Sequence, residues 1–232
     1  NIELPKVQRN FLKALKEAGK KVVFVNCSGS AIALTPETES CDAILQAWYP
    51  GQEGGEAVAR VLFGEYNPAG KLPITFYKNS EQLPDFKDYS MKGRTYRYMN
   101  NALFPFGYGK SYTSFKIGDA QLSSSTLKKG EQIKLTVPVS NVGKKDGTEV
   151  VQVYVKDPTD TDGPLKTLKA YQRIEVKAGA TAQAVITLDS KNFELFDAAT
   201  NTVRAKAGNY EVYYGNSSAD KDLKKIMVNY EY

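Results

Sequence analysis

The stretch QIKLTVPVSNVGKKDGTEVVQVYVK, residues 132–156, decides the fold class of the C-terminal half of the chain. Apolar and polar side chains alternate on either side of a turn that contains Gly143 and Gly147. A period of two is typical of strands that bury one face. The pattern therefore predicts two such strands, at 132–142 and 149–156.

The same alternation continues to the C-terminus. Four further stretches show it, with turn glycines between them: 171–176, 182–188, 209–214 and 225–232. No helical period appears after Ser114. Roughly seven short strands over about 115 residues predict an all-β sandwich of the fibronectin III or immunoglobulin type.

The first third of the chain has a different pattern, which begins with a helix. Apolar side chains at three- and four-residue spacing predict this helix at 4–19, with Pro5 in its first turn and Gly19 at its end. The side chains expected on its apolar stripe are Leu4, Val7, Phe11, Leu12 and Leu15. Further on, the stretch around Thr35 and Pro36 fits both a short helix and an edge strand.

Two short apolar runs in the same region predict strands. KKVVFVN at 20–26 and the run at 43–48 are apolar along their length, as expected of parallel strands buried on both faces. A glycine turn follows, and then a predicted helix at 56–63. Its side chains expected to face the sheet are Ala57, Val58, Val61 and Leu62. This alternation predicts an α/β domain with a mostly parallel sheet and helices.

Residues 67–110 connect the two patterns. Four prolines interrupt a segment that is rich in Tyr and Phe and has little periodicity. The segment is long for a connection, yet it is too aromatic for a disordered linker. We therefore expect an ordered arm that packs along a neighbouring surface.

Composition excludes several classes of function. The chain has no His, so it holds no Ser-His-Asp or Cys-His catalytic set, and with only 2 Cys a zinc site is not expected. Its 31 basic and 26 acidic residues are scattered, without the clustered basic face that nucleic-acid binding requires. No run is apolar over the length that a membrane span needs, and none of these residues is expected to form a signal peptide. The chain opens on a helical pattern without Met, so we expect a longer protein upstream.

The two cysteines, Cys27 and Cys41, are predicted to be buried free thiols. Cys27 follows the first predicted strand and Cys41 precedes the second. In a parallel pair the two sulfurs would lie at opposite ends of the sheet, roughly 15–20 Å apart at about 3.3 Å per residue. A disulfide needs Cα atoms within about 7 Å of each other.

Two motifs, in this order, resemble family 3 glycoside hydrolases. YPGQEGGEAVARVLFGEYNPAGKLPITF at 49–76 resembles the signature that closes the second domain of that family, and MKGRTYRYMNNALFPFGYGKSYTSF at 91–115 resembles the arm that follows it. AGNYEVYYGNSS is similar to the fibronectin III-like domain that ends many members. The resemblance implies three parts: the end of an α/β-sandwich domain at 1–78, an aromatic-rich connecting arm at 79–114, and a fibronectin III-like domain at 115–232.

The resemblance also implies the chemistry of a complete enzyme. Members of this type hydrolyse terminal β-linked sugars with retention, using an Asp nucleophile on an N-terminal barrel and a Glu acid/base on a second-domain loop. Both are expected upstream of Asn1, so no catalytic residue is assigned in this chain, and neither a metal nor another cofactor is expected. The arm looks more like that of β-xylosidases than of β-glucosidases.

The partners and location follow from the same resemblance. We expect an oligosaccharide substrate bound through the complete enzyme, the missing N-terminal barrel domain, and a homo-oligomer as a further possibility. Neither nucleic acid nor membrane is an expected partner. The resemblance implies a secreted or periplasmic protein.

Four side chains are candidate substrate-binding residues. Trp48 ends a predicted strand at the ligand-facing edge of the sheet, where it either walls a sugar subsite or packs as core. Glu53 precedes the helix at 56–63, where an acid also complements the helix dipole. Arg94 and Tyr96 lie in the arm, where they either contact sugar hydroxyls or pack between domains.

A second hypothesis is a non-catalytic module whose sandwich binds carbohydrate or docks a partner. Such a sandwich usually presents a row of exposed aromatics, but Tyr210, Tyr213 and Tyr214 cannot all share one strand face. For the α/β part we expect an exposed sheet edge and exposed apolar surface. The chain should then associate with itself or with the rest of the enzyme.

Overall fold

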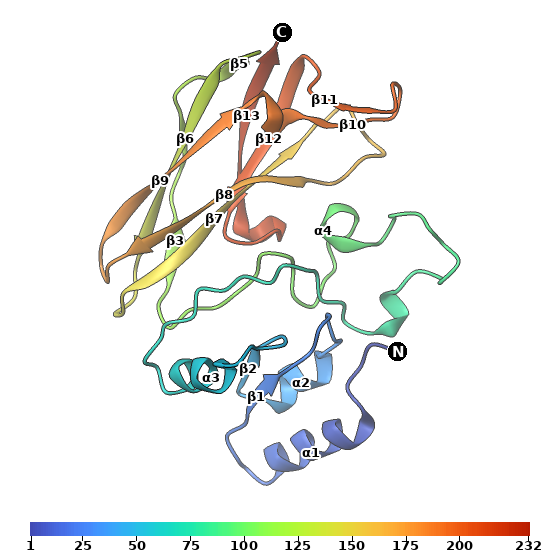
Figure 1. The fold of residues 1–232 in the computed structure, drawn as a ribbon, viewed down its shortest axis with the longest axis vertical. Coiled ribbons are helices and arrows are strands. Elements are labelled where there is room, and N and C mark those ends of the chain that lie inside the picture. Colours follow the sequence, from blue (N-terminus) through green and yellow to red (C-terminus); the bar gives the residue numbers. More distant parts are fainter.

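The computed structural model describes residues 1–232. The α/β region lies at one end of the molecule and the β-sandwich at the other, and the chain between them runs as an extended arm across the space between the two (Figure 1). The fold class predicted from the sequence is confirmed: helices and parallel strands come first, and a largely antiparallel β domain follows.

The α/β region contains three helices and two strands. In chain order they are α1 (Lys6–Glu17), β1 (Val23–Asn26), α2 (Thr35–Ser40), β2 (Ala43–Gln46) and α3 (Gly54–Leu62). The strands pair in parallel, with Val23 opposite Ala43. Gly19 follows α1 with φ of 70°, as expected of a glycine that ends a helix, but Pro5 is the residue before the helix rather than part of its first turn. The segment from Thr35 is a helix, which settles the open alternative.

The prediction that both strands are buried on both faces is wrong. Val23 in β1 is 53% exposed, and no residue of β2 is buried. Burial on both faces requires a layer of helices on each side of the sheet, and this sheet has two strands only. Val7 and Phe11, on the apolar stripe predicted for α1, are also exposed, and so is Leu62 of α3, which was predicted to face the sheet.

A small core still forms in this region. It consists of Leu4, Leu12, Val22, Leu34, Cys41 and Phe76. Phe76 lies beyond α3, at the end of the α/β region, and pairs with Phe104 of the arm as an isolated antiparallel bridge, with the two rings edge to face at 6.1 Å. The core of the α/β region is therefore completed by a residue beyond its helices and strands, and Phe104 of the arm packs against that residue.

The sandwich consists of two facing sheets. The five-stranded sheet has the order β5 (Thr126–Lys128), β13 (Leu223–Glu231), β12 (Gly208–Gly215), β7 (Gly147–Lys156) and β8 (Thr167–Val176). In the second sheet β6 (Gln132–Asn141) pairs with β3 (Phe115–Ile117), β4 (Gln121–Leu122) and β9 (Thr181–Asp189). A separate hairpin of β10 (Leu195–Asp197) and β11 (Thr202–Arg204) completes the fold.

The predicted alternation places the sandwich core. Along β6, every second residue from Ile133 to Asn141 is buried, and Leu135 and Val137 are fully so. In β12, Tyr210 and Tyr214 point into the core while Tyr213 lies on the opposite face. A contiguous cluster of 18 buried residues fills the space between the sheets.

The arm is ordered and packs on neighbouring surfaces, as predicted. It contains a 3₁₀ turn at Ser80–Gln82 and the short helix α4 (Thr95–Tyr98). Towards the α/β region, Ser80 donates from its backbone N–H and its hydroxyl to the carboxylate of Glu3, over 2.8 and 2.7 Å. Towards the sandwich, Leu165 N–H donates to the Arg97 carbonyl over 2.7 Å. The arm therefore joins both halves of the molecule.

Candidate functional site

A polar network lies at the carboxyl ends of β1 and β2. Asn26, which is 4% exposed, donates its side-chain N–H groups to Gln46 Oε1 at 2.6 Å and to Ser28 Oγ at 3.1 Å. The Gln46 amide in turn donates to Ser28 Oγ at 3.2 Å. These contacts fix the loop after β1 against the end of β2, at the edge where open α/β sheets place their ligand-binding loops.

Trp48 stands next to this network in a strained conformation. Its φ is 57°, a left-handed value that costs a non-glycine residue about 1–3 kcal/mol. Its ring is half-buried and meets Phe76 edge to face at 6.1 Å. One side of Trp48 therefore packs on the small core and the rest stays accessible at the ligand-facing edge, while its role as the wall of a sugar subsite stays a prediction.

The neighbouring Tyr49 covers the loop after β1. The side chain is 78% exposed, and its ring lies so close to Gly29 that a Cβ there would come within 2.5 Å of Tyr49 Cε2. A side chain at 29 would therefore displace the exposed Tyr49 ring from this position. Trp48 and Tyr49 thus place two consecutive aromatic side chains at this edge of the sheet.

The cysteines are free thiols, but one expectation about them is wrong. Cys41 is buried and burial raises the pKa of its thiol. Cys27 is exposed, in the loop that follows β1. The predicted burial is confirmed only for the cysteine that packs into the small core.

Glu53 occupies the residue before α3 and is exposed. Its side chain makes no capping hydrogen bond to the helix. Glu56, one turn further on, pairs with Arg60 across 2.5 Å on the helix surface. Glu53 is thus the carboxylate at this edge that carries no partner within the chain.

Arg94 and Tyr96 lie elsewhere, on the arm beside the sandwich. The Arg94 guanidinium donates to the carbonyls of Ser90 and Asp88, over 2.9 and 2.5 Å, and so holds the preceding loop. Tyr96 accepts a hydrogen bond on its hydroxyl from Leu168 N–H at 3.0 Å. No contact in the structure joins either residue to Trp48 or Glu53, so the four candidates fall into two groups.

The surroundings of Tyr96 are aromatic. Its ring stacks on Phe106 at 4.5 Å and meets Tyr154 of β7 edge to face at 5.6 Å. Burial of Tyr154 raises the pKa of its hydroxyl, which donates to Gln152 Oε1 at 2.5 Å. The packing alternative therefore describes Tyr96 in this structure.

A buried polar seam between the two halves was missed by sequence reasoning. Lys71 Nζ pairs with Glu149 Oε1 at 2.7 Å, with side chains 13% and 5% exposed, and Asn216 donates to the other carboxylate oxygen at 3.1 Å. A cavity of about 370 Å³ opens beside them. The available signal was Glu149 and Gln152, two polar residues in an otherwise apolar strand run.

Gln152 extends this seam to the arm. It is 3% exposed and donates its side-chain N–H groups to the carbonyls of Gly107 and Asn216, over 3.0 and 2.9 Å. Gly107 has φ of 78°, and a Cβ there would fall 1.9 Å from Gln152 Oε1. Only glycine fits at this close approach.

Two further properties of the chain bear on the type of site. No group of three or more His, Cys, Asp or Glu side chains is arranged to hold a metal ion. None of the helices has the length and apolar character of a membrane span.

Comparison with known families identifies both halves. Residues 1–112 match the glycosyl hydrolase family 3 C-terminal domain, and residues 149–218 match the fibronectin type III-like domain. The chain is a family 3 C-terminal domain joined to a fibronectin type III-like domain. The resemblance seen in its motifs is thereby confirmed, while the boundaries at 78 and 114 stay a prediction.

The relatives of this family 3 chain are β-xylosidases and β-glucosidases. It is 62% identical to a xylan 1,4-β-xylosidase of Xylanibacter ruminicola, over 98% of this chain and 26% of that protein. A periplasmic β-glucosidase of Salmonella typhimurium is 38% identical, over 94% of this chain and 30% of that protein. The β-glucosidase DesR of Streptomyces venezuelae, solved with D-glucose, superposes with a TM-score of 0.86 at 31% identity, covering 99% of this chain and 31% of that one. The chain thus spans about a quarter to a third of these relatives.

Proposed function

We propose that this chain is the C-terminal part of a retaining, exo-acting β-glycosidase that removes terminal β-xylosyl units. The observation that carries the proposal is the 62% identity to a xylan 1,4-β-xylosidase along 98% of the chain, against 38% to the periplasmic β-glucosidase. The xylosidase-like arm motif at 91–115 supports the same choice. A secreted or periplasmic location agrees with the periplasmic relative.

We propose further that residues 1–232 alone do not hydrolyse glycosides. A retaining mechanism needs two carboxyl groups about 5–5.5 Å apart, one to attack the anomeric carbon and one to protonate the leaving oxygen. At the ligand-facing edge the Glu56 carboxylate pairs with Arg60. Glu53 therefore has no second unpaired carboxylate next to it in the sequence. The nucleophile and the acid/base are expected in the parts of the enzyme that precede this chain.

In this proposal the α/β region supplies one wall of the sugar site. Trp48 offers an aromatic face and Glu53 an unpaired carboxylate at the edge that holds the Asn26 network. Arg94 and Tyr96 contribute to substrate binding indirectly, by fixing the position of the arm. Arg94 holds the loop at 88–94, and Tyr96 anchors the arm to the sandwich. A direct sugar contact by Arg94 stays a prediction.

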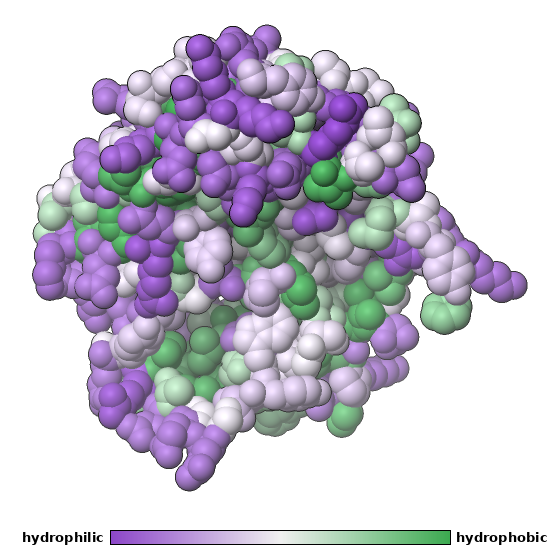
Figure 2. Space-filling model, turned by 45° about the horizontal axis from the view of Figure 1, so that its top comes forward, coloured by the Kyte–Doolittle hydropathy of each residue, from purple (hydrophilic) through white to green (hydrophobic).

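The remaining domains of the enzyme have a surface on which to dock. Several large apolar side chains of the α/β region are exposed: Val7, Phe11, Val23, Leu62 and Phe63. In the view of Figure 2 the sandwich end is largely hydrophilic, whereas apolar residues gather below it. Large exposed apolar side chains are candidates for an interaction surface, and we propose that the barrel domain covers them.

The experiment compares the intact enzyme with the isolated chain on aryl β-xyloside and aryl β-glucoside. The intact enzyme should cleave the xyloside faster, and the isolated chain should cleave neither. Faster glucoside cleavage would overturn the xylosidase choice. Turnover by the purified chain would overturn the assignment of the carboxylates to upstream domains.

A substitution in the intact enzyme tests whether Trp48 forms part of the sugar site. Trp48→Ala should raise KM for the xyloside about tenfold with a smaller change in kcat, since an aromatic contact that binds substrate and transition state alike is lost. Phe196→Ala, at an exposed position 56% accessible on the β10–β11 hairpin, is the matched control and should change neither. Equal effects of the two substitutions would argue against a substrate role for Trp48.

A further inference from the structure

The arm repeats a short motif that carries two exposed aromatic side chains. Residues 85–90 read DFKDYS, in which an Asp followed by an aromatic residue occurs twice in succession. Phe86 is 92% exposed and Tyr89 is 90% exposed, which makes them the most exposed aromatic side chains of the chain. In Figure 1 this loop projects from the side of the molecule, between the 3₁₀ turn at Ser80–Gln82 and α4.

Each repeat is closed by its own Asp side chain. Asp85 Oδ1 accepts a hydrogen bond from Lys87 N–H at 2.8 Å. Asp88 Oδ1 accepts one from Ser90 N–H, also at 2.8 Å. Such side-chain turns fix the backbone on both sides of the aromatic residue, and the guanidinium of Arg94 holds the end of the loop. The backbone that carries the two rings is therefore in place before anything binds them, which lowers the entropic cost of binding.

The residues around the two rings favour a sugar over another protein domain. Lys87 lies between the aromatic residues, and Asp85, Asp88 and Lys92 lie within three positions of one or the other; all four are exposed. The cores of protein–protein interfaces are depleted in Asp and Lys. A pyranose instead presents a face of C–H groups that packs on an aromatic ring, while the hydroxyls around its rim form hydrogen bonds with charged side chains.

The first residues of the chain lie against the same part of the arm. Ile2 N–H donates to Ser80 Oγ at 3.1 Å, and Ser80 in turn donates to the Glu3 carboxylate. Figure 1 shows the N-terminus beside the 3₁₀ turn from which the loop continues. In the proposed enzyme the acid/base belongs to the part that precedes Asn1. The segment that carries it therefore joins the chain at the base of this loop.

We propose that Phe86 and Tyr89 form an aromatic platform for a xylo-oligosaccharide, on which the sugar units that follow the terminal xylosyl unit stack. This inference rests on the proposed β-xylosidase function, and adds to it a preference for oligosaccharides over xylosides with a single sugar unit.

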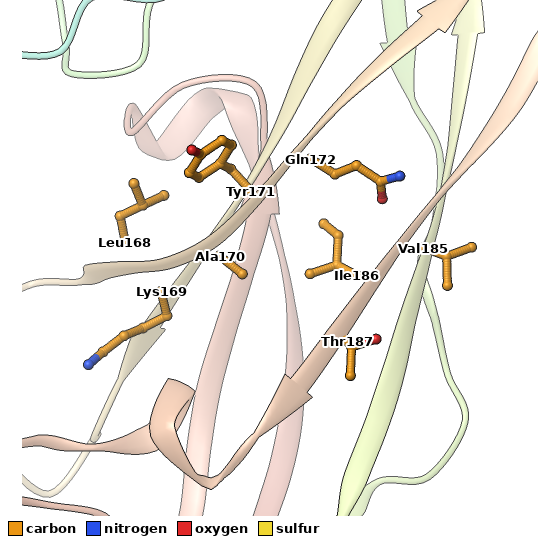
Figure 3. Close-up of a pocket in the computed structure, with 8 residues that line it drawn as sticks. All are labelled: Leu168, Lys169, Ala170, Tyr171, Gln172, Val185, Ile186 and Thr187. Atoms are coloured by element: carbon orange, nitrogen blue, oxygen red, sulfur yellow. The ribbon is translucent and has the colours of Figure 1, made fainter.

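A groove on the sandwich has a contrasting arrangement. It measures about 510 Å³ and lies between residues 168–172 of β8 and 185–187 of β9 (Figure 3). Tyr171 is the one aromatic residue along it, and Figure 3 shows this side chain on the opposite side of the strand from Gln172. Because Tyr171 is 69% exposed and has no second ring beside it in this groove, it is a matched control for the platform.

The experiment measures kcat/KM of the intact enzyme on xylotetraose and on an aryl β-xyloside, which carries one sugar unit. Combining Phe86→Ala with Tyr89→Ala should lower the ratio of the two values about tenfold, mainly through a higher KM for xylotetraose, because the stacking contacts with the following units are lost. Both side chains are exposed, so the fold should tolerate the substitutions. Tyr171→Ala should leave the ratio unchanged.

Two outcomes would overturn the platform. One is an unchanged ratio in the double variant. The other is an equal loss on both substrates, since the rings would then hold another domain of the enzyme in place. Faster cleavage of aryl β-glucoside by the wild-type enzyme would overturn the proposed function instead. The ratio is then measured with cellotetraose and aryl β-glucoside, and the same two outcomes decide on the platform.

Discussion

The sandwich and the α/β region bury their apolar side chains to different extents. Eighteen buried residues form one continuous core between the two sheets, whereas the α/β region has a cluster of six. The helix α1 keeps Phe11 largely in solvent, at 63% exposed, and Phe63 at the end of α3 is 83% exposed. The two regions share a chain and an ordered arm, but only one of them closes its core with its own strands.

The difference shows which parts of a fold are self-sufficient. A sandwich buries both inner faces against each other, so β3 to β13 need no further layer. An α/β sheet needs helices on both faces and strands along its edges, and the two strands β1 and β2 lack most of these neighbours. The α/β region instead depends on the arm, through the contact of Phe104 with Phe76, and in our proposal on the barrel domain.

A substitution in the sandwich core should cause the largest loss of stability. Leu135→Ala removes a fully buried side chain of β6 and should lower the free energy of unfolding of the sandwich by about 3–4 kcal/mol. Leu12→Ala, in the small core at 8% exposed, is the counterpart and should cost about 2 kcal/mol in a separate, earlier transition. Urea unfolding monitored by hydrogen exchange resolves the transitions of the two regions. A single transition that shifts equally for both variants would contradict the division.

Breaking the seam should have an intermediate effect that reaches both regions. Lys71→Met leaves the Glu149 carboxylate buried without its counter-charge, and should cost about 2–3 kcal/mol since Lys71 retains slight exposure. Combining Lys71→Met with Glu149→Gln should recover much of the loss, because no buried charge remains. Thermal unfolding of the single and double variants measures this. A double variant less stable than the single one would exclude the explanation.

The smallest effect should be a pH dependence confined to the α/β region. Asp42 accepts a hydrogen bond from Val22 N–H at 2.9 Å and pairs with Lys21 at 3.1 Å, which lowers its pKa from 3.8 to about 2. A pKa lower in the folded than in the unfolded state stabilises the fold fully above about pH 4, and this stabilisation is lost as the pH falls toward about 2. Asp42→Asn should remove that dependence. The stability difference between wild type and Asp42→Asn, measured across this range, should shrink with acid; a constant difference would refute the assignment.

The sequence predicted the elements that have a clear period. The six alternating stretches became β6, β7, β8, β9, β12 and β13 with shifts of a few residues, and the two apolar runs became the parallel pair. The strands of two or three residues, such as β4 and β10, were not predicted because a period of two cannot be recognised over so few positions. Whether Val23 is buried depends on what covers the sheet, and its own stretch of sequence does not encode that.

The positions of candidate site residues could be predicted only where the neighbouring sequence determines them. Trp48 lies at the ligand-facing edge because it follows a parallel strand, although β2 ends at Gln46, two residues earlier than predicted, and Glu53 precedes a helix because a glycine turn places it there. Tyr96 was out of reach of such reasoning, since its partners Leu168 and Tyr154 are more than fifty residues away. The same holds for Lys71 and Glu149, which only the docking of the two halves brings together.

The contact between Glu3 and Ser80 has a consequence for the newly made chain. These residues are 77 positions apart, and Phe76 must in turn meet Phe104 to complete the small core. At a synthesis rate of about 5–20 residues per second, roughly 4–15 s pass after Glu3 is made before Ser80 exists. Throughout that interval the small core that Leu12 of α1 shares with Leu34 and Cys41 lacks Phe76, so part of its apolar surface stays open and the ribosome-bound chain is then a natural substrate for a chaperone.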